Sequence, residues 1–131
     1  MFVKIVESLF LSDFVTVNAA KTLPHFERFN ITDVLTVSTY RIHANSRLPH
    51  VNYHYQMIYD TLTQRLLTNQ LLERCLTTIE KSIANGGNIV VHCEAGISRS
   101  VTIIMAYLMK TYEWTVEEAF KYVVKLRPVA Q

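Results

Sequence analysis

The residues best suited to chemistry are a cysteine and an arginine that a short loop joins. They lie in the stretch 92–100, His-Cys-Glu-Ala-Gly-Ile-Ser-Arg-Ser, between the apolar runs 89–91 and 101–109. A short β-branched run indicates a buried strand, and the longer run indicates a buried helix. Cys93 is therefore expected at the end of a strand, and Arg99 at the start of a helix.

This arrangement suits a bound phosphate, because amides in a tight loop at a helix N-terminus lack intrahelical partners and the helix dipole is positive there. Arg99 adds a planar fork that matches two phosphate oxygens. The same field favours a thiolate at Cys93, and Ser100 can donate a hydrogen bond to the sulfur. The backbone amides expected to bind phosphate belong to Glu94, Ala95, Gly96, Ile97, Ser98 and Arg99. The alternative is that Cys93 is only a small buried hydrophobe.

The stretch 92–100 resembles the signature of the cysteine-dependent protein phosphatases, His-Cys-x-x-Gly-x-x-Arg-Ser/Thr. The sequence Ala-Gly-Ile-Ser-Arg-Ser within it resembles the dual-specificity branch of that family. The stretches 9–13 and 31–37 are also similar to this branch. The resemblance implies a hydrolase that removes phosphate from phosphotyrosine and phosphoserine or phosphothreonine through a phosphocysteine intermediate. It implies no metal and no cofactor, and it gives His92 the role of orienting the loop and tuning the thiol.

The resemblance also implies a general acid. Family members carry an aspartate on a loop after the strand that corresponds to residues 53–59, and Asp60 occupies that position. Such a carboxylate protonates the leaving oxygen and then takes a proton from the attacking water. The alternative is that Asp60 is a turn residue or a helix cap.

Length, composition and net charge indicate what kind of protein this is and which partners it is expected to bind. A chain of 131 residues, half of them hydrophobic and 18% charged, predicts one globular domain over residues 1–131. A net charge of +2 is too small to argue for a nucleic acid or membrane partner, and no apolar run is long enough for a membrane span. Two cysteines give no disulfide framework, and a thiolate needs a reducing compartment. We expect a cytoplasmic or nuclear monomer that acts on phosphorylated proteins.

The remaining patterns predict an α/β fold with a central, mostly parallel sheet flanked by helices. Strands are expected at 2–6, 9–11, 33–38 and 53–59 and in the run that leads into Cys93. Helices are expected at 17–29, 66–84 and 98–112 and after Trp114, where Thr115 and Glu118 form a capping box. Pro24 is expected to kink or split the first helix, and Cys75 is expected to be a core residue.

The segment 39–52 is polar, and the simplest interpretation is a solvated loop. Its basic and imidazole side chains are Arg41, His43, Arg47 and His50. One alternative is a basic rim that helps to dock phosphoproteins. Another is a metal site of His43, His50 and His54, whose spacing matches no common ligand pattern.

Substrate class follows from the resemblance. A chain this short lacks the extra loops that build a deep phosphotyrosine cleft, which implies a shallow site. The loop carries Glu94 and no lysine, which disfavours a lipid phosphatase and highly anionic substrates. The alternative from another class is a catalytically weak or inactive phosphoprotein-binding module, although such a module would not need Cys93.

Relatives usually continue past the equivalent of Pro128 with a final helix, so lower stability and activity are also expected.

Overall fold

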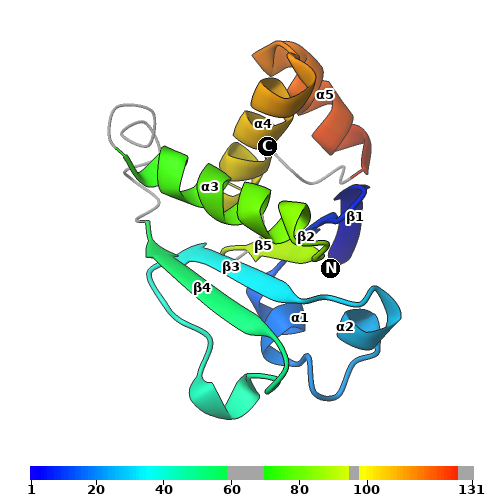
Figure 1. Ribbon diagram of the computed structural model, residues 1–131, viewed down its shortest axis with the longest axis vertical. Helices are drawn as coiled ribbons and strands as arrows, with labels where there is room; N and C mark the ends of the chain where they lie inside the picture. The colour runs from blue at the N-terminus through cyan, green and yellow to red at the C-terminus, as the bar shows by residue number, and fades with distance from the viewer. Residues whose placement is uncertain (59–69, 95–97, 127–131) are drawn as a thin grey trace.

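Five strands form one sheet in the computed structural model, which describes residues 1–58, 70–94 and 98–126. The strand order is β1-β2-β5-β3-β4 (Figure 1). The strands are β1 (Phe2–Val6), β2 (Leu9–Ser12), β3 (Asp33–Ser38), β4 (Asn52–Met57) and β5 (Ile89–His92). Only the β1–β2 pair is antiparallel, while β2–β5, β5–β3 and β3–β4 are parallel. The predicted mostly parallel sheet is confirmed.

Helices cover both faces of this sheet (Figure 1). They are α1 (Phe14–Asn18), α2 (His25–Arg28), the 3₁₀ turn η1 (Ala44–Ser46), α3 (Leu71–Ala84), α4 (Arg99–Tyr112) and α5 (Val116–Leu126). One core cluster lies between the sheet and α3, α4 and α5, and a second lies between the sheet and α1 and α2. The predicted α/β architecture with flanking helices is therefore present.

The prediction of one continuous helix over residues 17–29 is wrong, because the middle of this segment is not helical. A short α1 begins at Phe14 because the Asp13 carboxylate caps it, accepting a hydrogen bond from the Thr16 amide at 2.9 Å. The chain leaves the helix after Asn18, and α2 begins only after Pro24. Of the two effects expected of Pro24, a kink or a split, the structure shows two separate helices. Pro24 is the N-cap residue of α2, where a missing N–H removes no hydrogen bond from that helix.

The other elements agree with the predictions, apart from their ends. The predicted strand 53–59 is β4, and the predicted helix 66–84 is α3; residues 59–69 lie outside the described residues. The predicted capping box is confirmed: the Glu118 amide donates to Thr115 Oγ1 at 3.1 Å, and the Thr115 amide donates to Glu118 Oε1 at 2.8 Å.

The central strand β5 is buried on both faces. Ile89 and Val91 face the cluster under α3 and α4, whereas Val90 faces the cluster under α1 and α2. This two-sided burial explains why the strand reads as a continuous β-branched run and not as an alternating one. The strand ends at His92, so Cys93 lies at the carboxyl edge of the sheet.

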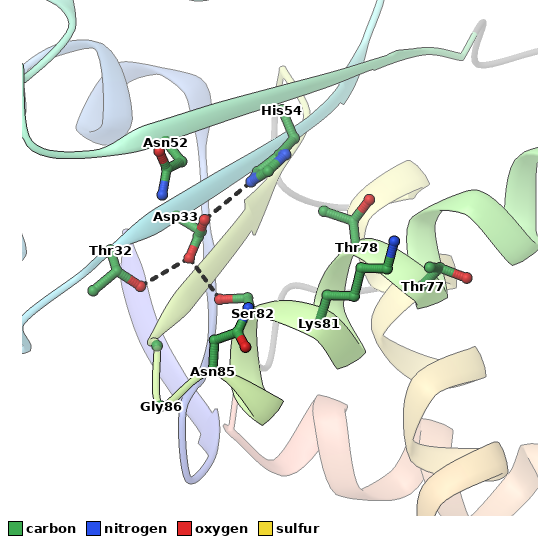
Figure 2. Close-up of a pocket in the computed structure, with 11 residues that line it drawn as sticks. Thr32, Asp33, Asn52, His54, Thr77, Thr78, Lys81, Ser82, Asn85 and Gly86 are labelled. Atoms are coloured by element: carbon green, nitrogen blue, oxygen red, sulfur yellow. Dashed lines mark hydrogen bonds and ion pairs between the residues drawn. The ribbon is translucent and has the colours of Figure 1, made fainter.

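A pocket of about 580 Å³ lies at the opposite edge, between the starts of β3 and β4 and the end of α3 (Figure 2). At its floor the Asp33 carboxylate accepts hydrogen bonds from Ser82 Oγ at 2.7 Å, Thr32 Oγ1 at 2.9 Å and His54 Nε2 at 3.0 Å. Burial alone would raise the pKa of Asp33, but these hydrogen bonds outweigh it and lower that pKa. The ionised carboxylate therefore ties β3, β4 and α3 together.

We expect Ser82→Ala to lower the free energy of unfolding by about 1–3 kcal/mol, because it removes a donor from a buried carboxylate. Thr78→Ala is the matched control, since the exposed Thr78 hydroxyl donates only to the Arg74 carbonyl of its own helix. Urea denaturation of both variants measures the difference. Equal losses in the two variants would contradict the role of Asp33 as the tie between the strands and α3.

Candidate active site

Cys93 follows β5 directly, and its side chain is only 2% exposed. Its Sγ lies 3.3 Å from Ser100 Oγ, in the first turn of α4. A thiolate has no proton, so in that state the hydroxyl is the donor and the sulfur is the acceptor. The structure therefore brings together the two residues that the sequence paired as nucleophile and sulfur-stabilising donor.

Arg99 opens α4 and is 6% exposed. Its Nη1 donates to the carbonyl of Ile58 at 3.0 Å, and its Nη2 forms an ion pair with Glu94 Oε2. Ile58 comes just after β4, so the guanidinium links the end of that strand to the loop after Cys93. The planar group is thereby oriented before any ligand is bound.

Glu94 does more than the sequence predicted. We expected its amide to bind phosphate and its charge to oppose the positive field. The structure shows a carboxylate shared between Arg99 and the end of β3, because Oε1 accepts hydrogen bonds from Ser38 Oγ at 3.1 Å and Thr39 Oγ1 at 2.9 Å. The negative charge is directed at Arg99, so Glu94 is a support for the guanidinium. No local pattern signals this role, since Ser38 and Thr39 are distant in sequence.

His92 is fully buried between Thr36 and the backbone of the loop. Its Nδ1 lies 3.0 Å from the Cys93 carbonyl, and its Nε2 lies 2.7 Å from Thr36 Oγ1. A carbonyl only accepts, so Nδ1 carries the proton and the Thr36 hydroxyl donates to Nε2. Burial lowers the pKa of His92 to about 4, so the ring is neutral near pH 7. A neutral ring thus connects β3 to the Cys93 carbonyl.

Of the other predicted residues, some are described by the structure and some are not. Ser98 is the N-cap residue of α4, while Asp60, Ala95, Gly96 and Ile97 lie outside the described residues. Cys75 is a core residue as predicted, 1% exposed, and burial raises its pKa to about 12. That thiol is therefore protonated and unreactive at neutral pH.

The three histidines considered as a metal site are used elsewhere or lie apart. His54 binds Asp33, and His43 Nδ1 accepts a hydrogen bond from the Asn45 amide at 3.1 Å, which caps η1. Within residues 1–58, 70–94 and 98–126, no three His, Cys, Asp or Glu side chains gather as metal ligands. In the same ranges, no helix is long and apolar enough to cross a membrane.

Comparison with known proteins identifies the family. Residues 14–131 match the family "Dual specificity phosphatase, catalytic domain". The chain is 37% identical over 100 residues to rat "Dual specificity protein phosphatase 5". The matched region covers 76% of this chain and 25% of the rat protein. The chain belongs to the dual specificity phosphatase family, and it spans a quarter of the length of this relative.

Solved structures agree with this assignment. A mouse putative dual specificity phosphatase complexed with zinc tungstate has a TM-score of 0.84 and 29% identity, over 99% of this chain and 77% of that one. The human tyrosine phosphatase-like serine/threonine/tyrosine-interacting protein has a TM-score of 0.80 and 26% identity. The match covers 99% of this chain and 86% of that one.

We expect stability to fall as the pH drops from 7 to 5, because the unfolded chain protonates His92 near its ordinary pKa of 6.5 and the folded chain does so only near 4. The loss between these two pH values should be roughly 2 kcal/mol. Urea denaturation at each pH measures it. The control is His92→Asn, whose stability should change much less over the same range.

This pH window separates His92 from the buried carboxylate of Asp33. The pKa of Asp33 is lowered from 3.8, so its contribution is present above that value and is lost only in more acidic solution. A parent chain whose stability does not decline between pH 7 and pH 5 would contradict the neutral, buried His92.

Proposed function

We propose that the chain hydrolyses phosphotyrosine and phosphoserine or phosphothreonine in proteins through a cysteinyl-phosphate intermediate. The observation that carries the proposal is the buried Cys93 Sγ at 3.3 Å from Ser100 Oγ, at the N-terminus of α4. A site that only binds phosphate needs amides and a cation, whereas a thiol with its own donor suits a nucleophile that must also leave. Family membership supports the same reaction class.

In the first step, Cys93 Sγ attacks phosphorus, so that a phosphorus–sulfur bond forms and the bond to the leaving oxygen breaks. Arg99 and the amides of residues 94–99 stabilise the charge on the three other oxygens. Asp60 gives its proton to the leaving oxygen. Arg99 needs little reorganisation for this role, because Glu94 and the Ile58 carbonyl already hold it.

In the second step, a water molecule attacks phosphorus and the sulfur leaves as a thiolate. Asp60 accepts a proton from this water, and Ser100 stabilises the departing sulfur with its hydroxyl hydrogen. The products are inorganic phosphate and the regenerated Cys93 thiolate. His92 contributes by holding the Cys93 carbonyl, which fixes the backbone beneath the nucleophile.

A phosphoprotein-binding module of the same fold is the second candidate. It is favoured by the likeness to the human serine/threonine/tyrosine-interacting protein. The Cys93–Ser100 pair argues for turnover, because binding alone gives no reason for that contact.

Hydrolysis of an aryl phosphate near pH 6 tests the choice between these candidates. We expect turnover by the parent chain and a loss of at least about 10³-fold in Cys93→Ser, as for other removed nucleophiles. Cys75→Ala is the control, since it removes the core thiol and leaves the site intact. The Cys93→Ser chain should still bind phosphopeptides, and a folded parent without turnover would favour the binding module.

The assignment of Asp60 is tested by the pH dependence of the rate. We expect Asp60→Asn to lower kcat by about 10²- to 10⁴-fold and to flatten the alkaline limb of the profile, because the variant has no proton to give. The measurement is kcat against pH for a substrate with a poor leaving group. A profile of unchanged shape and height would exclude Asp60 as the general acid.

A further inference from the structure

A second, smaller pocket of about 140 Å³ lies between β4 and the loop that connects β3 to it. Its lining residues are Thr36, Arg41, Ile42, Arg47, Tyr53, His54 and Tyr55. Two of them are arginines, and none is an aspartate or a glutamate. Among the residues that the structure describes, the wall of the pocket therefore carries positive charge and no carboxylate.

Both arginines are held by stacking on tyrosine rings. The Arg41 guanidinium carbon lies 4.4 Å from the centre of the Tyr55 ring, and that of Arg47 lies 5.4 Å from the centre of the Tyr53 ring. Arg47 Nε also donates to the Ile42 carbonyl at 3.0 Å. Stacking uses the flat face of a guanidinium and leaves the N–H groups on its edge available to a ligand.

The charges of these two arginines are not neutralised within the described part of the chain. Neither guanidinium forms an ion pair there, and the only hydrogen bond of either is the one from Arg47 to Ile42. The Tyr53 hydroxyl accepts a hydrogen bond from the Leu48 amide at 3.0 Å, so its own proton can be donated. Like charges that face one small pocket favour the entry of an anion.

We propose that this pocket is a second, non-catalytic site for a phosphoryl group. Guanidinium forks and phenol hydroxyls are donors that match the oxygens of a tetrahedral oxyanion. A volume of about 140 Å³ suits one such group and is below the range of about 300–1,000 Å³ that drug-sized ligands occupy. The lining residues within the described part of the chain include no cysteine or carboxylate, so we expect the group to be bound and not hydrolysed.

The second site is connected to the candidate active site by one side chain. Thr36 lines the pocket and donates to His92 Nε2 at 2.7 Å, and His92 in turn holds the Cys93 carbonyl. The phosphoryl group has two possible sources: a second phosphorylated residue of the protein substrate, or the free phosphate that turnover releases. The first source rests on the proposed function, whereas the oxyanion site itself does not.

The test is a titration with inorganic sulfate, a tetrahedral oxyanion that is not hydrolysed. The amide NMR signals of Tyr53 and Tyr55 report on the pocket. We expect saturable shifts in the parent chain and about tenfold weaker binding in Arg41→Gln and in Arg47→Gln, since each loses a charged donor.

The matched control is Arg28→Gln. Arg28 also stacks on an aromatic ring, Phe29, at 5.4 Å, but it does not line the pocket, so its loss should leave sulfate affinity unchanged. Equal weakening in Arg28→Gln, or no saturable shift at Tyr53 and Tyr55, would overturn the proposal. Arg47→Lys is measured if the glutamine variant unfolds; it keeps the charge but loses the fork, and unchanged affinity would also count against the site.

Peptides with one and with two phosphorylated residues separate the two sources, using the Cys93→Ser chain so that nothing is hydrolysed. A gain in affinity from the second phosphoryl group that disappears in Arg41→Gln assigns the pocket to the substrate. Equal affinities for both peptides, with sulfate binding intact, assign it to free phosphate. A parent chain without turnover would remove the proposed function and leave the sulfate result standing.

Discussion

The candidate site depends on one buried cation, the guanidinium of Arg99. Burying a charge costs free energy unless partners replace its water, and the chain supplies such partners from distant segments. The Ile58 carbonyl comes from the end of β4, and the Glu94 carboxylate is itself held by Ser38 and Thr39 at the end of β3. The carboxyl ends of three parallel strands therefore meet at the start of α4, and an anion placed there finds the guanidinium already oriented.

Buried charges of opposite sign lie at the two ends of the parallel strands: Arg99 at the carboxyl ends and Asp33 at the amino ends. Asp33 at the start of β3 is surrounded by hydroxyl and imidazole donors, and it ties that strand to β4 and α3. Thr36, in the middle of the same strand, hydrogen-bonds to His92. Burial lowers the pKa of that ring and keeps it neutral, so it adds no charge that would need a partner of its own. In this way β3 fixes the positions of the site residues without containing a nucleophile.

Sequence patterns predicted those parts of the fold and site that depend on neighbours along the chain. The buried run before Cys93, the helix after Arg99 and the capping box at Thr115 each depend on residues only a few positions apart. The supports for Glu94 and His92 lie on β3, and no local pattern reveals a contact over that separation. His54 was one of three candidate metal ligands, yet it binds Asp33, because pairing of β3 with β4 decides its neighbours. Asp60 stays a prediction.

The most direct measurement is a rapid acid quench of the chain during hydrolysis of an aryl phosphate, followed by mass spectrometry of its peptides. The proposed mechanism predicts a phosphoryl group on the peptide that contains Cys93, with a larger amount in Ser100→Ala, since the sulfur then leaves without its donor. Turnover with no phosphoryl group on any peptide, or with the group on a residue other than Cys93, would contradict the mechanism.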